Sequence, residues 1–552
     1  MLIEIGLARL SQEPAKAADF HRIEGEIKVL EADASLRAWG WFFLALYIGA
    51  MLVFGVFAMR KVRNSDDFAT ARNSYGPLFL AFALTATTAS GGTFLGIPAI
   101  GYTSGFSALW YAFVYPLGTY VGLLICFRGI RRAGSSFGTR SMPEYLGERY
   151  DSEAVRLLAS IFSILLLFYL AGQLLAGGVM FNKMMGVELL PALLVTALII
   201  MFYIVIGGAH ADILTDGVQG ALMLLLSLAV TAMFIGGFTL EGGFSGMVQT
   251  LKSDDPHLVE VLHPNNPILN SWWDVFAIFM MHTPLGLLPH VANKLWALKS
   301  DREQKRFIVF AFTFGMILPA ITFGGILARA IIGDDLVSGG GSANDAIPAL
   351  FVAVLPTWVA ALVGAGVLAA VMSTADGLVV STSQIFANDI YRLSIVPRLK
   401  NTPSEETIDR VSLRISRIAS ALVIAGAIWL AWESQTMNVA LLIAAGIGGM
   451  TSAITGPMFA GILWRGTTKA GALAGFLVGA LVFIITKANW LRPSWFEDSA
   501  FETVGLWLIS QAPNPFACGA IGSLSSIVAV IIVSLATKRM QDEHLGRFFS
   551  QN

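Results

Sequence analysis

Charged side chains are scarce in this sequence of 552 residues. Asp, Glu, Lys and Arg make up 13% of it, whereas an ordinary soluble domain carries about 25%. Apolar residues replace the missing charges and reach 55%, which is more than one water-soluble core can bury. The scarcity of charge therefore argues against a soluble protein and predicts an integral membrane protein.

Cysteine and an excess of charge of either sign are also lacking. The sequence has two cysteines, Cys126 and Cys518, and a disulfide framework is therefore excluded. Neither cysteine has the spacing of a metal ligand. The formal net charge is -1 with no basic domain, which makes nucleic acid an unexpected partner. No nucleophile elbow, phosphate-binding loop or catalytic His/Cys cluster occurs, so we do not expect an enzyme.

Apolar runs of about 20 residues, long enough to cross a bilayer as a helix, recur along the chain. They predict an all-α membrane protein with about thirteen spans. These lie near 39–59, 77–102, 107–127, 155–182, 188–206, 213–238, 274–296, 307–332, 350–390, 411–432, 437–463, 470–487 and 515–536. The run at 350–390 is too long for one straight crossing and predicts a bend or a projecting end. The transporter-sized domain is thus 39–536, between a peripheral tail at 1–38 and a cytoplasmic tail at 537–552.

Basic residues concentrate in alternate loops, which the positive-inside rule assigns to the cytoplasm. These loops lie at 60–72, 128–149, 299–306, 392–410 and 465–469. The opposite loops hold only Lys183, Lys252, Lys487 and Arg492. We therefore expect a multi-pass protein of the inner or plasma membrane, with its N-terminus outside and its C-terminus in the cytoplasm.

Two of the predicted spans are interrupted. The span 77–102 contains a run of Thr, Ala, Ser and Gly from Thr85 to Thr93, and the span 274–296 contains Thr283-Pro284 and then Pro289. In hydrocarbon, a broken backbone is tolerated only where protein or a cavity satisfies its polar groups. Each interrupted span opens a set of five, which predicts two inverted repeats at about 77–238 and 274–463 with a binding site at the breaks. Ordinary proline kinks are the alternative.

Three residues of the ninth span predict a cation site. Ala370, Ser373 and Thr374 share one helix face, and the carbonyls of Ala86 and Ala89 in the first broken span could lie opposite. Two hydroxyl and three carbonyl oxygens form a neutral cage that suits a monovalent hard cation. Hydroxyls that bond only to their own helix are the alternative.

Acidic residues inside membrane spans are functional candidates by default. Asp216 and Asp376 are two of these, and they define a candidate second cation site. We expect Asp212 to be solvated at the cytoplasmic interface, Lys294 to snorkel or cap, and His290 to be a packing residue.

The break in span 77–102 also predicts where a solute binds. Backbone N–H groups at the start of a half-helix attract anions. The residues expected around the solute are Thr88, Ser90, Gly91, Gly92, Thr93, Gln173, His282 and Thr283. We expect no Lys or Arg at mid-membrane depth, so a small monocarboxylate fits better than a dianion, whose second charge would be buried without a partner.

Three motifs together resemble the sodium/solute symporter family over roughly 40–540. They are Tyr203–Gly208 with Asp212, Asp216 and Gln219; Ala369–Asp376 running on to Asn388–Tyr391; and Leu288–His290 with Lys294. The resemblance implies a LeuT-type inverted-repeat fold and Na+ as the co-transported ion, with no organic cofactor. It places Ala86, Ala89, Ala370, Ser373 and Thr374 at the family's conserved sodium site.

The expected function is sodium-coupled symport of a small organic solute by alternating access. The run Gly92–Pro98 resembles the acetate, monocarboxylate and pantothenate branch, so a monocarboxylate or related anion is the first reading. A neutral amino acid or a sugar is the alternative. A membrane sensor with a transporter fold is disfavoured because only about 16 residues follow the last span. The expected partners are the solute and the lipid bilayer.

Overall fold

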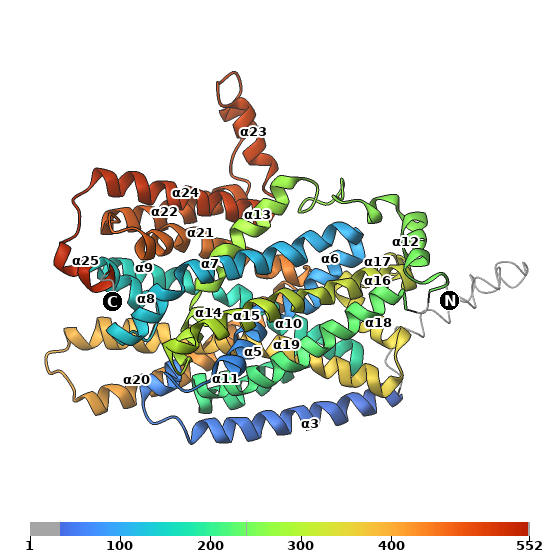
Figure 1. Cartoon of the computed structure of the whole chain (residues 1–552), viewed down its shortest axis with the longest axis horizontal. Coiled ribbons are helices and arrows are strands. Elements are labelled where there is room, and N and C mark those ends of the chain that lie inside the picture. Colours follow the sequence, from blue (N-terminus) through green and yellow to red (C-terminus); the bar gives the residue numbers. More distant parts are fainter. Residues whose placement is uncertain (1–33, 239, 550–552) are drawn as a thin grey trace, which may run out of the picture.

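The computed structural model describes residues 34–238 and 240–549. Within these ranges every regular element is a helix, apart from one isolated bridge between Tyr75 and Leu298. Figure 1 shows most of the long helices running in a similar direction as one bundle. The predicted all-α fold is confirmed.

Ten helical segments of the described chain are long and apolar enough to cross a membrane, and the bent pair Trp272–Leu287 with Pro289–Ala297 makes eleven. The helices that form these segments are α3 (Ala34–Met59), α6 (Ile97–Ser104), α7 (Ala108–Phe137), α9 (Glu153–Ser163), α10 (Leu166–Met185), α11 (Leu189–Gly236), α13 (Trp272–His282), α14 (Pro289–Ala292), α15 (Gln304–Ile317), α16 (Thr322–Ile332), α19 (Thr357–Gln384), α20 (Glu405–Glu433), α21 (Val439–Leu463), α22 (Lys469–Lys487) and α24 (Pro515–Ala536). Two more predicted spans contain apolar helices that are too short to cross a membrane by themselves. One is α5 (Pro77–Thr88), which ends at an interruption, and the other is the segment Leu189–Met201. Together these account for the thirteen predicted spans.

Several boundaries differ from the prediction. Helix α3 begins at Ala34, so residues 34–38 belong to a span, while the rest of the predicted tail lies outside the described residues. The long run at 350–390 is divided, because α18 (Ala346–Val354) ends before Pro356 and α19 starts at Thr357. Proline cannot donate the backbone hydrogen bond that would continue the first helix. Beyond Gln384, α19 runs on into the π-helical segment η9 (Ile385–Ile395).

The predicted spans 188–206 and 213–238 are the two halves of α11. The backbone leaves helical geometry at Gly208, whose φ is +52° and ψ is -142°. Only glycine adopts this conformation readily. A Cβ at Gly208 would also lie 2.5 Å from the carbonyl oxygen of Phe68 in α4 (Ser65–Thr70), so glycine is required here for space as well.

Both predicted interruptions are present. Helix α5 ends at Thr88, Ala89 has φ -91° and ψ +78°, and the chain resumes as the π-helical turn η1 (Gly92–Gly96) before α6. The second broken span runs from α13 through η4 (Thr283–Leu287) to α14 and η5 (Asn293–Ala297), with a bend of 52°. The Gly, Ser, Thr and Pro residues that predicted the breaks are the residues at which the helices stop.

Glycine residues allow other helices to pack closely against both breaks. A Cβ at Gly96 would lie 2.4 Å from the backbone nitrogen of Ala440 in α21. A Cβ at Gly122 of α7 would lie 1.8 Å from the carbonyl oxygen of Thr283. These contacts enclose the interrupted backbone in protein, as an interruption within hydrocarbon requires.

Shorter helices cover the two ends of the bundle. Figure 1 shows α12 (Gly243–Asp254) and α17 (Asp335–Ser338) at one end, and α8 (Met142–Tyr150) with α25 (Asp542–Phe549) at the other. The predicted C-terminal tail is therefore partly helical, and the Phe548 backbone oxygen accepts a hydrogen bond from Arg132 at 2.7 Å. Helix α23 (Glu502–Ser510) projects from the side of the bundle (Figure 1).

Candidate functional site

The interruption in α5 lies directly against α19. The Ser373 hydroxyl donates to the carbonyl oxygen of Ala86 at 2.9 Å and lies 3.0 Å from that of Ala370. The Thr374 hydroxyl donates to the carbonyl oxygen of Thr87 at 2.8 Å. Ser373, Thr374 and Ala370 are all fully buried. The structure therefore brings the oxygens of Ala86, Ala370, Ser373 and Thr374 close together where α5 and α19 meet in the protein interior.

The oxygen set fits a hard monovalent cation in its chemistry. It consists of carbonyl and hydroxyl groups without a formal charge, the kind of ligand that hard cations take. Ala89 follows the end of α5 in a non-helical conformation and is 1% exposed, so its carbonyl is the remaining candidate ligand at the break. The hydroxyls now bond to the carbonyls, and a bound ion would receive lone pairs from both kinds of group.

A cluster of buried charged side chains lies next to these oxygens, and Thr87 connects the two. The ammonium of Lys294 contacts the Thr87 hydroxyl and the carboxylate of Asp216, and it lies 3.0 Å from the carboxylate of Asp212. Asp216 also accepts from the Thr87 hydroxyl at 2.8 Å. All three charged side chains are nearly or fully buried. Thr87 therefore belongs to both networks, through its carbonyl on one side and its hydroxyl on the other.

Two expectations from the sequence are wrong here. Lys294 neither snorkels nor caps, and Asp212 is not solvated, because the two residues form an ion pair in the protein interior. Lys294 is thus a basic residue buried within the second broken span, together with its two acidic partners. Asp212 and Asp216 are four residues apart on α11 and share a face, which was a readable signal for a common partner. Which distant lysine would meet that face could not be read from spacing.

Asp216 lies on α11 and Asp376 lies on the neighbouring helix α19. Asp376 accepts a hydrogen bond from Thr215 at 3.4 Å, so consecutive residues of α11 contact Lys294 and Asp376. Gln219, on the next turn of α11, donates a hydrogen bond to Tyr47 of α3. The sequence did not indicate that Tyr47 belongs to this region. Asp216, the partner of Lys294, thus differs in its surroundings from Asp376.

A small cavity lies beside the first break. Its lining residues come from both broken spans and from α7, α10 and α21, and they are Thr88, Ser90, Gly92, Thr93, Ile97, Tyr111, Tyr115, Tyr169, His282, Leu285, Ala440, Ile443 and Ile447. Five of the eight predicted solute-binding residues are among them. The cavity encloses about 20 Å³, which is space for one water molecule. The conformation is therefore closed around this site, and a solute enters only after helices move.

The other three predicted residues lie elsewhere. The Gly91 N–H donates to the Gln173 side-chain oxygen at 2.7 Å, so these two residues bond to each other behind the cavity. The Thr283 hydroxyl donates to the carbonyl of Phe279 at 2.9 Å. The Thr283 hydroxyl therefore bonds along its own chain, and Thr283 is not among the residues that line the cavity. The N–H of Gly92 is also satisfied, by the Ser90 hydroxyl at 3.1 Å.

Three tyrosines that line the cavity, Tyr111, Tyr115 and Tyr169, are not among the solute-binding residues predicted from the sequence. The Tyr115 hydroxyl is 2.8 Å from that of Thr93, and Tyr111 and Tyr115 flank the His282 ring at 5.8 and 5.4 Å. Tyr169 interacts with the side chains of both Ser90 and Thr374. Apolar periodicity in α7 and α10 gave no reason to separate these tyrosines from core aromatics.

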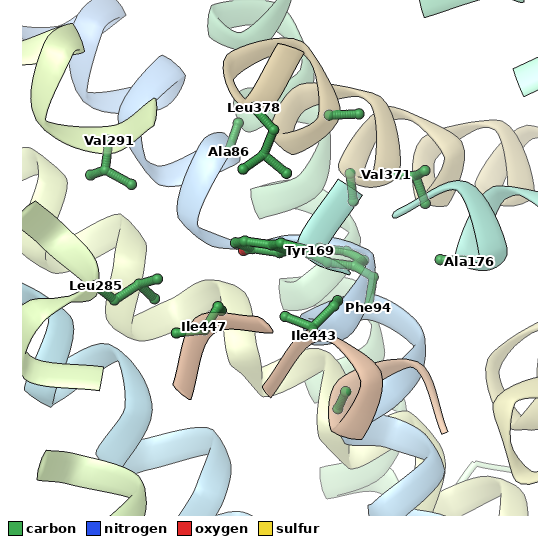
Figure 2. Close-up of a cluster of buried hydrophobic side chains, with 14 of the residues drawn as sticks. Ala86, Phe94, Tyr169, Ala176, Leu285, Val291, Val371, Leu378, Ile443 and Ile447 are labelled. Carbon is green, nitrogen blue, oxygen red and sulfur yellow. The ribbon is translucent and has the colours of Figure 1, made fainter. Parts of the chain in front are cut away.

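Tyr169 joins the cavity to the candidate cation site. Figure 2 shows its ring between Ala86 and Leu378 on one side and Ile443 and Ile447 on the other. His290 meets the same ring edge to face at 5.4 Å and is buried. The Tyr169 side chain is thus placed to respond to changes at either site.

The His282 ring has a defined orientation. Its Nδ1 is 2.7 Å from the carbonyl oxygen of Ile278, which can only accept, so Nδ1 carries a proton. In the neutral ring, Nε2 is then an acceptor. The cavity therefore combines one ring acceptor with tyrosine, threonine and serine hydroxyls, and its lining contains no Asp, Glu, Lys or Arg.

Comparison with known proteins identifies the sequence relationship. The model of the sodium:solute symporter family matches residues 68–479. The sodium/pantothenate symporter of Escherichia coli (strain K12) is 27% identical over 448 residues, which cover 80% of this chain and 89% of that protein. The sodium/proline symporter 2 of Staphylococcus saprophyticus is 25% identical over 511 residues, covering 90% and 92%.

Solved structures share the fold. A substrate-bound, outward-open Na+-coupled sialic acid symporter has a TM-score of 0.70 at 22% identity, covering 91% of this chain and 99% of that one. A nucleobase-cation-symport-1 family transporter in a closed conformation has a TM-score of 0.52 at 14% identity, covering 87% and 97%. At these identities the likeness concerns the arrangement of helices alone.

Proposed function

Because the chain belongs to the sodium:solute symporter family, we propose that it couples the inward movement of Na+ to uptake of a small monocarboxylate. The observation that carries this proposal is the convergence of Ala86, Ala370, Ser373 and Thr374 oxygens at the break in α5, beside a small cavity at the same break that is lined by hydroxyl groups and apolar side chains. An ion there and a solute in the cavity would share the backbone of one interrupted helix.

Sodium is the co-transported ion in this proposal, with Ala86, Ala89, Ala370, Ser373 and Thr374 as its ligands. A neutral oxygen cage holds a monovalent ion without the strong attraction of a carboxylate, which favours release as well as binding. Binding would replace the two hydroxyl-to-carbonyl hydrogen bonds by ion–oxygen contacts. It would thereby tie α5 to α19 and favour the closed arrangement of the two helices.

The proposed solute carries a single carboxylate. Hydroxyls of Thr93, Tyr115 and Tyr169 could donate to it, and the backbone N–H groups of Gly91 and Gly92 could do so once they leave their present acceptors. The lining contains no Lys or Arg, so a co-bound sodium ion would supply the nearest uncompensated positive charge. A second carboxylate would be desolvated without a partner.

An amino acid such as proline is the alternative, and the likeness to a sodium/proline symporter favours it. Its ammonium group would need an acceptor or a negative charge. The cavity lining includes no carboxylate, and the acceptors it offers are His282 Nε2, hydroxyl oxygens and backbone carbonyls, none of which carries a negative charge. A monocarboxylate without an amine, comparable to the solute named for the pantothenate symporter, avoids that cost.

We propose that Lys294 supplies a fixed positive charge next to Asp216, so that this carboxylate does not require a second sodium ion. The ammonium contacts Asp216, Asp212 and Thr87 at once. Asp376, the other member of the candidate second cation site, accepts a hydrogen bond from Thr215. In this cycle the protein carries one sodium ion per solute.

Uptake into proteoliposomes tests the proposed function. The purified chain is reconstituted, and labelled acetate, pyruvate, lactate, pantothenate, proline and galactose are offered with and without an inward sodium gradient. We expect at least one monocarboxylate without an amine to accumulate only when the gradient is present. Sodium-driven accumulation of proline or galactose, with no such monocarboxylate carried, would contradict the solute assignment, and accumulation independent of sodium would contradict the ion.

A further inference from the structure

The chain between α22 and α24 forms a hairpin of exposed apolar side chains. The hairpin comprises residues 488–514 and contains the short turn η11 (Pro493–Trp495) and helix α23. We propose that it lies along the membrane surface and inserts its apolar side chains among the lipid headgroups of one leaflet. This surface is separate from the cation site and the cavity, so the proposal does not depend on the solute.

Many large apolar side chains of the hairpin are exposed. Exposed fractions are 59% for Trp490, 62% for Trp495, 69% for Phe501, 54% for Val504 and 40% for Trp507. Within α23 only Gly505 is buried. Large apolar side chains gathered on an exposed surface mark a site of interaction with a membrane or a protein.

Position relates the hairpin to the bilayer. Helix α22 ends at Lys487 and α24 starts at Pro515, and both helices are membrane spans. The base of the hairpin therefore lies where these spans leave the hydrocarbon. Figure 1 shows α23 projecting sideways, across the direction of α22 and α24, rather than continuing along it. An element that leaves the boundary in that direction stays at the depth of the headgroups.

The lipid-facing surface of the bundle continues into the hairpin. Leu481 and Ile484 of α22 are 54% and 45% exposed, and Val528 of α24 is 53% exposed, as expected for side chains that face lipid. The exposed Trp490 follows Ile484 by less than two helical turns. The apolar surface of the hairpin is thus an extension of an existing contact with the bilayer.

The chemistry of the hairpin matches the interface between lipid and water. Tryptophan is enriched there because its ring is apolar and its N–H is polar. Arg492 is available to lipid phosphates, while Glu497 and Asp498 at the turn are exposed and can remain in water. Val504 and Trp507, three residues apart, share one face of α23, and Leu506 lies on the opposite face. Surrounding lipid covers all sides of a helix, whereas a second protein surface would cover one.

The base of the hairpin is held in place. The Trp273 ring of α13 meets the Trp507 ring at 5.1 Å, and its N–H donates to the Gln511 side chain at 2.9 Å. The Lys487 ammonium donates to the carbonyl of Ala512 at 3.0 Å. The ring of Phe496 packs on Gly505, where an added Cβ would lie 2.1 Å from it. These contacts fix the direction of the projection relative to the bundle.

Site-directed spin labelling tests the placement. Cys126 and Cys518 are first replaced by alanine, and a nitroxide is then attached to Val504→Cys or, as the matched control on the same hairpin, to Glu497→Cys. Both labelled proteins are reconstituted in phosphatidylcholine–phosphatidylglycerol vesicles after elution as a single monodisperse peak. Collision rates with oxygen, which concentrates in lipid, and with a water-soluble nickel chelate are measured by power saturation.

We expect the ratio of oxygen to nickel collisions at position 504 to exceed that at position 497 by about threefold or more, as for a side chain within the headgroup region. Equal ratios at the two positions would place α23 in water and overturn the proposal. Protection of position 504 from both reagents, with dipolar broadening that grows with the protein-to-lipid ratio, would also overturn it, because a second copy of the chain would then cover the helix.

Discussion

Thr87 takes part in two networks through different atoms. Its carbonyl oxygen accepts from Thr374 at the candidate cation site, and its hydroxyl contacts Lys294 and Asp216. The residue stands in the last turn of α5, next to the break. A movement of this backbone on ion binding therefore displaces the side chain that meets the buried charges.

Substitution of Thr374 tests the assignment of sodium ligands. We expect Thr374→Ala to raise the sodium concentration for half-maximal uptake, because one ligand and one hydrogen bond to Thr87 are lost. A loss of about 1–2 kcal/mol corresponds to a roughly fivefold to thirtyfold increase. Thr374→Ser keeps the hydroxyl and should stay near the parent value. Sodium dependence that is unchanged in the alanine variant, at equal protein in the membrane, would refute the assignment.

Removing the ammonium of Lys294 should destabilise the protein. Lys294→Met leaves Asp212 and Asp216 buried without their partner, a change that costs about 3–5 kcal/mol when a buried ion pair is broken. We expect a lower midpoint of thermal unfolding in detergent and a smaller loss for Lys294→Arg, which keeps the charge. The double variant Lys294→Met/Asp216→Asn should lose less than the sum of its single changes. A methionine variant as stable as the parent would contradict the role of the pair.

At the scale of the element, the two interrupted helices depend on close neighbours. Helix α7 passes the second break at Gly122, and α21 passes the first at Ala440. Neither approach leaves space for an additional methyl group on the glycine concerned. The breaks are consequently packed parts of the bundle, and their motion requires motion of α7 or α21.

Gly122→Ala should disturb the second break. The new Cβ would lie 1.8 Å from the Thr283 carbonyl oxygen, so backbone has to shift. Overpacking of this kind costs about 1–3 kcal/mol, and we expect reduced thermal stability together with a reduced uptake rate. Gly49→Ala is the matched control, because nothing lies within 4 Å of a Cβ at that position in α3. The contact with Thr283 would not matter if the two alanine variants behaved alike.

At the scale of the whole molecule, the size of the cavity bears on the motion that transport requires, and the distribution of charge bears on the orientation in the membrane. The cavity of about 20 Å³ is too small for any organic solute, so transport requires α7, α10 or α21 to move relative to the broken helices. The basic residues concentrate in alternate loops of the sequence, which predicts that these loops face the cytoplasm.

Thiol labelling of intact cells tests this orientation. Cysteine is introduced at Ser253, in the exposed end of α12, or at Asn401, in the exposed loop before α20. We expect an impermeant maleimide added outside to modify Ser253→Cys and not Asn401→Cys, which should react only after the cells are permeabilised. Labelling in the reverse order would invert the topology and place the hairpin between α22 and α24 on the inner leaflet.

Local patterns in the sequence determined the class of the protein, its spans and the places where two spans break. The length of an apolar run is set by the bilayer, and Gly, Ser, Thr and Pro interrupt a helix wherever it packs, so neither property depends on distant residues. The same holds for the shared face of Ala370, Ser373 and Thr374, which follows from helical geometry. Membership of the family followed from motifs of the same local kind.

Tertiary structure alone decided which distant groups meet. It joined Lys294 to Asp212 and Asp216, made Tyr169 a neighbour of both Ser90 and Thr374, and turned the Thr283 hydroxyl back to Phe279. Each of these outcomes depends on the rotation of one helix about its axis relative to another. That rotation is set by the packing of all the surrounding side chains, Gly96 and Gly122 among them, and a local pattern contains no record of it.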